Sequence, residues 1–390
     1  MERERDVIVV GAGPAGATTA TILTQQGYDV LLLDRKAFPR DKTCGDAVPA
    51  GAIGILYRLG LQEKVETAVS RGELYPLTGM RLVSPSGHTM QAEFHKGESG
   101  TDSYVAPRLY FDALIQQHAV ESGAEFQQAQ VTGPVVEDGR VIGVRAKANG
   151  NSKTWQAKVV VGADGVTSSI TRALRPKTAQ HIDKHRAVAL RAYIDDIEIY
   201  PGEVEFYLYN EILPGYAWVF PTGEHSANIG LGMRLDHFRG RKQSLEEMLR
   251  QFLAMPVIKK RLKEGGKLRN MATWQLNFGS QKQLQHVYEG AILVGDAAGF
   301  INPLTGGGIH NSLVSAQLAA KTIHNALAQR DTSRKSMLGY EQECHDALWD
   351  NMKRSFNIQR TLLRFPSLVD WLVKWSGENS SLAKTFLTKL

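Results

Sequence analysis

The sequence predicts an α/β protein that combines a parallel nucleotide-binding sheet with an inserted antiparallel β-sheet and a helical C-terminal region. Three observations lead to this prediction. A strand, a glycine-rich turn, a helix and a second strand follow one another near the N-terminus; two central segments alternate like antiparallel strands; and a further buried strand precedes a long helical stretch. With 390 residues, the chain is long enough for two intimate domains.

The first unit covers residues 6–34. "DVIVV" at 6–10 and "YDVLLLD" at 28–34 are apolar runs of strand length, and residues 14–26 between them have helical character. This order predicts a βαβ unit, in which the two strands run parallel and the helix covers one face of the sheet.

The turn in this unit reads "GAGPAG" and carries the pattern G-x-G-x-x-G. Gly11 permits a sharp turn, Gly13 lets backbone amides approach a pyrophosphate, and Gly16 lets the helix pack closely on the strand. The start of the helix adds partial positive charge beside the phosphates. Asp34 ends the next strand about twenty residues on, where an acid accepts hydrogen bonds from ribose hydroxyls. These features predict a Rossmann-type dinucleotide site.

The middle of the chain departs from the βαβ pattern. "MRLVSPSGHTMQAEF" at 80–94 resembles two strands around a Pro-Ser-Gly turn, short strands follow between 126 and 163, and residues 185–234 alternate in strand fashion. We therefore expect three parts. The nucleotide-binding domain comprises residues 1–70, 105–180 and 285–330, the substrate domain comprises residues 71–104 and 181–284, and residues 331–390 form a helical region.

A second glycine-rich stretch, "VGDAAGFINPLTGGGIHNS", lies at 294–312. Asp296 follows the buried strand "AILVG", at the strand end where ligands collect in an open α/β sheet. Gly306, Gly307 and Gly308 are expected to leave backbone amides bare at the start of a helix, whose positive end stabilises a developing negative charge. A reduced flavin carries such a charge. Asp296 would then hold ribityl hydroxyls, and Pro303 would shape the turn beside the ring.

Composition narrows the class of protein. No apolar run approaches the roughly 18 to 20 residues of a transmembrane helix, and a strand beginning at Asp6 leaves no room for a leader, so a cytoplasmic location is expected. Two cysteines form neither a disulfide framework nor a metal site, so no metal is expected. The net charge of +6 fits a solvated surface or an anionic partner. No nucleic-acid partner is expected.

Three motifs resemble the flavin signatures of the group that contains aromatic hydroxylases, flavin-dependent halogenases and geranylgeranyl reductases. They are "GAGPAG", "GADG" at 162–165 and "GDAAGFINPLTGGG" at 295–308. The resemblance implies that Asp164 organises flavin and nicotinamide contacts and that Arg108 approaches the pyrophosphate of FAD. The residues expected to hold FAD are Gly11, Gly13, Pro14, Ala15, Gly16, Asp34, Arg35, Cys44, Gly45, Arg108, Asp164, Gly165, Gly295, Asp296, Pro303, Gly306, Gly307, Gly308 and Ile309.

Two further stretches resemble the geranylgeranyl reductase family within this group. They are "KTCGDAVP" at 42–49 and "GYAWVFPTGEHSANIGLGM" at 215–233, with Thr222 standing where the family usually has lysine. The resemblance implies that the chain reduces C=C bonds of a prenyl or other apolar small-molecule substrate. It suggests Cys44 as a proton source, or as a residue that orients one. Tyr216 and Trp218 alternate along a strand and so share one face, where we expect them to line an apolar tunnel, and these three are the expected catalytic residues. Core packing is the alternative role for all three residues.

Several functions remain open at this point. The same flavin motifs suit a monooxygenase, acting as a hydroxylase or epoxidase, or a halogenase, in both of which the reduced flavin reacts with O₂. A flavin-containing carrier-docking protein without turnover is another alternative. Electrons would come from NAD(P)H or from a reduced carrier protein. The basic stretch "NMKRSFNIQRTLLR" at 351–364, with Trp371 and Trp375 beyond it, suggests carrier docking or peripheral membrane contact, and a solvated helix face is the alternative.

Overall fold

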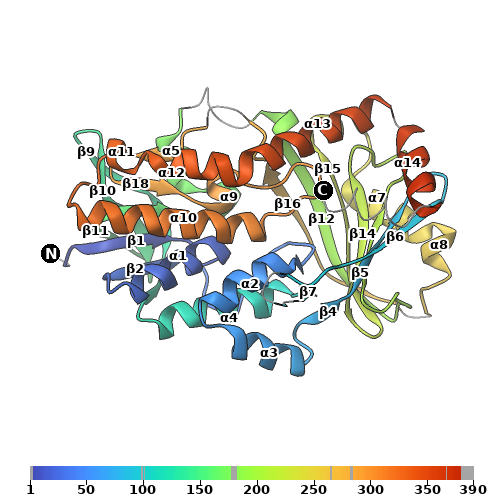
Figure 1. The fold of residues 1–390 in the computed structure, drawn as a ribbon, viewed down its shortest axis with the longest axis horizontal. Coiled ribbons are helices and arrows are strands. Elements are labelled where there is room, and N and C mark those ends of the chain that lie inside the picture. The colour runs from blue at the N-terminus through green and yellow to red at the C-terminus, as the bar shows by residue number, and fades with distance from the viewer. Residues whose placement is uncertain are drawn as a thin grey trace.

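The computed structural model describes residues 3–97, 100, 102–176, 182–263, 266–281, 284–365 and 367–378. Two large sheets lie next to each other along the long axis of the molecule, and the C-terminal helices run across both (Figure 1). The fold is therefore a mixed α/β fold, with a parallel sheet in one half and a largely antiparallel sheet in the other.

The sequence-predicted βαβ unit forms the centre of the first sheet. Its strand order is β17-β18-β11-β1-β2-β8, and β1, β2, β8, β11 and β18 are parallel. The strands are β1 (Arg5–Val10), β2 (Val30–Asp34), β8 (Glu125–Gln128), β11 (Asn151–Gly162), β17 (Val287–Tyr288) and β18 (Ala291–Leu293). Strands β9 (Gln130–Glu137) and β10 (Arg140–Ala148) extend β11 as an antiparallel meander. β1 and β2 are almost wholly buried, which explains their continuous apolar runs.

Helices pack on this sheet through small residues. α1 (Pro14–Gln25) is buried along most of its length and lies between α4 (Arg108–Glu121) and α10 (Ile309–Ala328). The other helices of this half are α2 (Ala50–Arg58), α3 (Gln62–Ser70), α5 (Ser169–Leu174) and α9 (Gly295–Ala298), with a 3₁₀ turn at Gly165–Thr167. Because α9 and α10 follow β18 directly, the glycine run at 306–308 meets the carboxyl ends of the parallel strands.

The second sheet has seven strands in the order β16-β12-β15-β14-β13-β5-β6. They are β5 (Gly79–Val83), β6 (Thr89–Glu93), β12 (Arg186–Asp195), β13 (Glu203–Tyr207), β14 (Tyr216–Gly223), β15 (Ser226–Arg234) and β16 (Leu268–Asn277). The expectation of a purely antiparallel sheet is wrong at one place, because β5 pairs parallel with β13. This occurs because the β5–β6 hairpin comes from a separate, earlier segment and joins the sheet at its edge.

Short elements connect the two halves. Strands β3 (Ala47–Val48), β7 (Ser103–Val105) and β4 (Tyr75–Leu77) form a three-stranded sheet. Helices α6 (Leu235–Phe238), α7 (Leu245–Ala254) and α8 (Pro256–Lys259) follow β15, and α7 covers β12 and β15. The sequence did not predict β16 or these helices.

The C-terminal region is helical over its described residues. It contains α11 (Arg334–Met337), α12 (Gly339–Cys344), a π-helical turn at His345–Trp349, α13 (Asp350–Arg364) and α14 (Ser367–Glu378). α14 packs on β6 at the far end of the second sheet. No helix in the described part of the chain combines the length and apolar content needed to cross a bilayer.

Candidate active site

One cavity of about 670 Å³ lies between the carboxyl ends of the parallel strands and the inner face of the seven-stranded sheet. It begins at Gly11 and Asp34, passes Arg108 and Asp296, and ends among Tyr216, Trp218 and Phe220. The cavity is thus continuous from the dinucleotide motif to the aromatic strand β14.

The glycine-rich turn is shaped by close backbone approaches. Gly11 has φ +101°, and a Cβ there would lie 2.3 Å from the carbonyl oxygen of Ala163. A Cβ on Gly16 would lie 1.8 Å from the carbonyl oxygen of Gly11. Both distances exclude a side chain, so the turn can form only with glycine at these two positions. Gly13, Pro14 and Ala15, at the start of α1, line the cavity, where the helix dipole favours an anion.

Asp34 ends β2 at the edge of the cavity. Its Oδ2 accepts a hydrogen bond from the amide of Ala12 at 3.0 Å, and its Oδ1 accepts one from the amide of Lys36. Arg40 reaches the same carboxylate at 3.5 Å. Asp34 is therefore held in a fixed orientation at the position that suits a ribose.

Two guanidinium groups share one buried carboxylate beside the turn. Arg108 binds Asp112 through two hydrogen bonds of 2.5 and 2.7 Å, and Nη1 of Arg40 binds the same group at 2.9 Å. Burial opposes the charge on Arg108, but the negative charge of Asp112 outweighs it and raises the pKa of the guanidinium. Both guanidinium groups line the cavity, where their N–H donors suit a pyrophosphate. Sequence reasoning found Arg108 but missed Arg40, which lies outside every motif.

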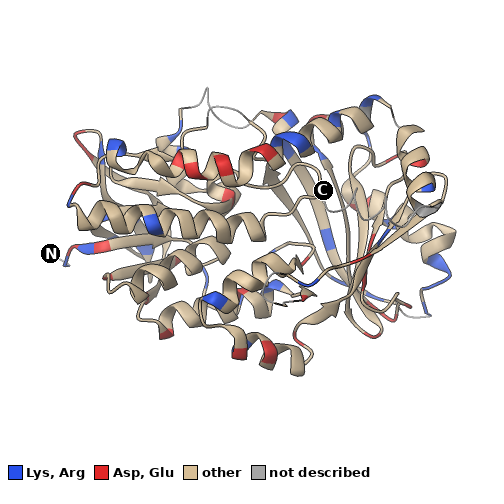
Figure 2. Cartoon of the chain, in the orientation of Figure 1, with Lys and Arg blue, Asp and Glu red and all other residues tan. Residues whose placement is uncertain are grey.

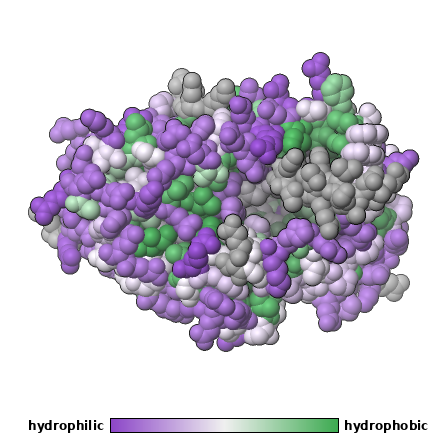
Figure 3. Space-filling view, viewed as in Figure 1, coloured by the Kyte–Doolittle hydropathy of each residue, from purple (hydrophilic) through white to green (hydrophobic). Residues whose placement is uncertain are grey.

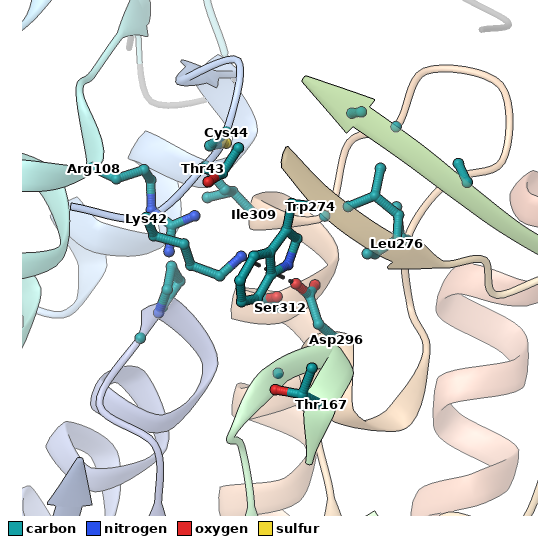
Figure 4. A pocket seen from close by; sticks show the side chains of 18 of the residues that line it. Lys42, Thr43, Cys44, Arg108, Thr167, Trp274, Leu276, Asp296, Ile309 and Ser312 are labelled. Atoms are coloured by element: carbon teal, nitrogen blue, oxygen red, sulfur yellow. Dashed lines mark ion pairs between the residues drawn. The ribbon is translucent and has the colours of Figure 1, made fainter. Parts of the chain in front are cut away.

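Lys42, Asp296 and Trp274 meet across the middle of the cavity (Figure 4). Nζ of Lys42 lies 3.8 Å from Oδ2 of Asp296 and 5.2 Å from the ring centre of Trp274. Burial lowers the pKa of Lys42. The Nε1 donor of Trp274 is buried without a protein partner among the described residues. Trp274 comes from β16, which the sequence did not predict.

Asp164 presents a free acceptor. Its Oδ2 accepts hydrogen bonds from the amide and the hydroxyl of Ser169 at 2.7 and 3.0 Å, whereas Oδ1 is buried and has no partner in the described part of the chain. Burial raises the pKa of this carboxyl. Because a buried acceptor without a partner is costly, Oδ1 is suited to a donor on a bound molecule.

The loop before α10 is organised by Asn302. Its Oδ1 accepts hydrogen bonds from the amides of Leu304 and Thr305, its carbonyl accepts from the amide of Gly306, and the amide of Gly307 donates to Oγ1 of Thr305. The expectation that all three glycine amides are bare is therefore wrong for Gly306 and Gly307. A tight turn satisfies these two amides internally, and Gly308 and Ile309 line the cavity at the start of α10.

An aromatic wall closes the opposite end of the cavity. Tyr216 and Trp218 share one face of β14, with ring centres 6.0 Å apart, and Phe206 packs edge-on against both Tyr216 and Phe220. The hydroxyl of Tyr216 donates to the carbonyl of Thr305 in the loop before α10. Burial raises the pKa of Tyr216, so its phenol stays protonated.

A buried polar network lies behind Cys44. Asn228 on β15 donates through Nδ2 to the carbonyl of Cys44 and to Oδ2 of Asp46, at 2.8 and 2.7 Å, and accepts from Nε1 of Trp218 at 2.8 Å. The hydroxyl of Tyr193 on β12 also donates to Asp46, at 2.6 Å. Burial raises the pKa of Asp46 to about 6. Strands of the second sheet thus fix the backbone of the Cys44 loop.

Most predicted residues meet in this one cavity. Those that line it are Gly11, Gly13, Pro14, Ala15, Asp34, Arg35, Cys44, Gly45, Arg108, Asp164, Gly165, Tyr216, Trp218, Asp296, Pro303, Gly306, Gly308 and Ile309. Gly16, Gly295 and Gly307 lie behind the lining, where Gly16 and Gly295 permit close packing. Three features fit FAD along the length of the cavity. Asp34 is placed for a ribose, Arg40 and Arg108 lie near the start of α1 for a pyrophosphate, and Oδ1 of Asp164 is an acceptor with no partner among the described residues.

Comparisons with known proteins agree with this geometry. The family model described as "FAD binding domain" matches residues 4–355. A digeranylgeranylglycerophospholipid reductase from Methanocella arvoryzae is 35% identical to this chain, covering 93% of it and 88% of the reductase. A protein of the same name from Methanosphaerula palustris is 30% identical over the same shares.

Solved structures show the same fold. A geranylgeranyl bacteriochlorophyll reductase-like protein from Thermoplasma acidophilum superposes with a TM-score of 0.83 at 26% identity, covering 95% of this chain and 92% of that one. A myxobacterial chondrochloren halogenase superposes with a TM-score of 0.77 at 22% identity, covering 93% and 83%. At that lower identity, the halogenase shows a shared fold and nothing more about activity.

Proposed function

This chain belongs to the family of FAD-binding proteins that includes the digeranylgeranylglycerophospholipid reductases, and from that membership we propose that it reduces carbon–carbon double bonds in prenyl chains. Its cofactor is FAD, and it is an FAD-dependent oxidoreductase. The substrate class that we propose is a lipid carrying geranylgeranyl chains, as in the relatives' name. One observation supports it most: a single cavity joins the cofactor-binding residues to an apolar end walled by Tyr216, Trp218 and Phe220.

An isolated prenyl double bond is not electrophilic, so its reduction needs a hydride at one carbon and a proton at the other. Bound FAD, once reduced, supplies the hydride. The aromatic wall of β14 holds the chain by apolar contact and keeps water away from it. Rigid placement of the double bond converts an encounter between two molecules into a step within one complex.

Cys44 is our candidate for the proton donor or for the residue that orients it. It is half-buried, lines the cavity, and sits on a backbone fixed by Asn228. A thiol at this position can give a proton to one carbon of the double bond as the hydride reaches the other, and regain it from water. The neighbouring phenol of Tyr216 is tied to the carbonyl of Thr305, which favours a positioning role for that residue.

We expect Cys44→Ala to bind FAD as the wild type does, because Asn228 holds the backbone of this loop without using the thiol, and to lose about 100-fold or more in turnover. FAD retention is measured by absorbance after gel filtration, and turnover by product formation. Cys344→Ala is the matched control, since this buried thiol lies outside the cavity. Unchanged turnover in Cys44→Ala would show that the thiol is a packing residue.

The central test is anaerobic. The purified protein is photoreduced, a geranylgeranyl lipid is added, and flavin absorbance is followed while the lipid is analysed for added hydrogen. We expect the flavin to reoxidise as a saturated product appears. A flavin that stays reduced until O₂ enters, followed by an oxygenated product, would instead assign a monooxygenase. We propose that the electron donor is either NAD(P)H or a reduced carrier protein. Repeating the test with each of these in place of light identifies which one reduces the flavin.

We further propose that residues 71–104 and 181–284 act as the substrate domain and that the C-terminal helices face a membrane at the cytoplasmic surface. On α14, Val369 and Val373 pack against Met90, while Trp371 and Trp375 face outward, 56% and 41% exposed, with their rings stacked at 5.4 Å. The same two helices carry exposed cations, namely Lys353, Arg354, Arg360 and Arg364 on α13 and Lys374 on α14 (Figure 2). Exposed aromatic rings on a helix pair that also carries cations suit a peripheral contact with anionic lipid.

A further inference from the structure

Helix α13 holds the loop before α10 through one stripe of polar side chains. Asn351, Ser355 and Gln359 are spaced four residues apart and therefore share a face of the helix. Asn351 and Ser355 each accept a hydrogen bond of 3.0 Å from Nδ2 of Asn302. Nε2 of Gln359 donates to the carbonyl of Pro303 at 2.7 Å. The C-terminal region, which carried no motif, thus holds the loop predicted to lie beside the flavin.

Gln359 differs from the other two residues because it also lines the cavity. Its side chain is buried, with the residue only 4% exposed, and its amide nitrogen is used by Pro303. Its carbonyl oxygen, Oε1, has no hydrogen-bond partner among the described residues. The bond to Pro303 also settles which end of the amide is the oxygen, since a carbonyl cannot donate.

A buried acceptor without a partner costs free energy in the folded protein unless something binds it. No described residue donates to Oε1, and Gln359 lines the cavity together with the apolar Ile301, Leu304 and Phe278. A molecule bound in the cavity can supply the missing donor, and the bond to Pro303 ties this acceptor to the loop before α10.

We propose that Gln359 is a ligand-binding residue of the active site whose Oε1 accepts a hydrogen bond from an N–H or O–H group of a bound molecule. Two sources offer this chemistry: the imide N–H of FAD and a hydroxyl on the substrate. The first source depends only on FAD binding, while the second rests on the proposed lipid reductase function. In both cases one glutamine couples the position of α13 to the occupancy of the site.

The test compares Gln359→Met with Ser355→Ala. Methionine nearly preserves the volume of glutamine while removing both its donor and its acceptor. Ser355→Ala removes one bond to the same loop, one helical turn away, and leaves the acceptor in place, so it reports the effect of loosening the loop alone. Circular dichroism and thermal unfolding establish that both variants fold.

If the donor is on FAD, we expect Gln359→Met to raise the Kd of the apoprotein for FAD about five- to tenfold and to shift the flavin absorbance bands, with Ser355→Ala close to wild type. If the donor is on the substrate, FAD binding stays unchanged, and the KM for geranylgeraniol rises by a similar factor while that for its methyl ether does not. Equal changes in Gln359→Met and Ser355→Ala would overturn the proposal. A Gln359→Met variant with unchanged Kd for FAD and unchanged KM for geranylgeraniol would also overturn it. The expected change in the Kd for FAD can be tested even if the protein reduces no lipid.

Discussion

At the scale of single residues, Asp46 is a buried acid whose pKa is raised toward neutrality. It lies outside the cavity lining, its residue is fully buried, and it has φ +66°. Burial raises its pKa from 3.8 to about 6, even though Tyr193 and Asn228 donate to it. Between these two values the folded protein keeps a proton that the unfolded chain has released. The free energy of unfolding therefore falls as pH rises through this window, by up to about 3 kcal/mol from this group.

We expect Asp46→Asn to gain stability relative to wild type as pH rises from about 4 to 6.5. Asparagine keeps an acceptor oxygen for Tyr193 and Asn228, tolerates the left-handed backbone, and cannot ionise. Urea unfolding of both proteins at a series of pH values measures the difference. Tyr193→Phe serves as a control, because it removes one hydrogen bond but keeps the titrating acid. A stability difference that does not change with pH would mean that Asp46 titrates at its ordinary value in the folded protein.

Single residues also mark the limit of what the sequence could predict. Gly11, Gly16 and Asp34 were predictable because a dinucleotide turn demands those residue types at fixed spacing. Arg40, Trp274 and Gln359 were not, because each reaches the cavity through tertiary packing and no local pattern marks it as a cavity residue. Asn302 lay within a quoted motif, yet its role depends on hydrogen bonds to α13, some fifty residues away in sequence.

At the scale of elements, the turn between β1 and α1 sets the tightest steric requirement of the site. We expect Gly16→Ala to lower FAD affinity by more than about 100-fold and to destabilise the protein by about 1–3 kcal/mol, because a Cβ 1.8 Å from the carbonyl oxygen of Gly11 must push α1 away from the turn. FAD titration of the apoprotein and thermal unfolding measure the two effects. Gly339→Ala is the matched control, since a Cβ there meets no atom within 4 Å. FAD affinity equal to wild type would show that the turn adapts.

The conformation of the loop at 40–46 could not be predicted from the sequence. Arg40 binds Asp112, Asp41 accepts two bonds from Arg191 at 2.7 and 2.8 Å, and Asp46 is held from β12 and β15. The resemblance to "KTCGDAVP" placed this loop near the flavin. Its partners come from both sheets, so its conformation follows from the assembled fold and not from local propensity.

At the scale of the whole molecule, the C-terminal helices run from the nucleotide-binding half to the far end of the second sheet (Figure 1). Figure 3 shows hydrophobic side chains reaching the surface in the region of α13 and α14, where Phe365 is 54% exposed. The cavity opens between the two sheets, and α13 spans from its lining residue Gln359 to this exposed end. A lipid substrate kept in a bilayer would need such an arrangement, because its chain must leave the membrane and reach the cavity.

We expect the protein to float with vesicles containing about one third anionic phospholipid, and to do so less as salt rises, because screening weakens attraction between the cations and the lipid surface. Arg360→Glu/Arg364→Glu should weaken binding by more than about tenfold, since each basic residue near such a surface contributes about 1 kcal/mol. Trp371→Ala should weaken it further at high salt, where apolar contact dominates.

The matched control reverses the same number of charges at the opposite end of the molecule, with Arg145→Glu/Lys147→Glu on β10, where both side chains are exposed (Figure 1). Equal loss of flotation in both double variants would mean that binding follows net charge and has no preferred face. Failure of the wild type to float would exclude a direct membrane contact by α13 and α14. The lipid would then have to be presented by a carrier, and the same basic face would be tested with an acidic protein in place of vesicles.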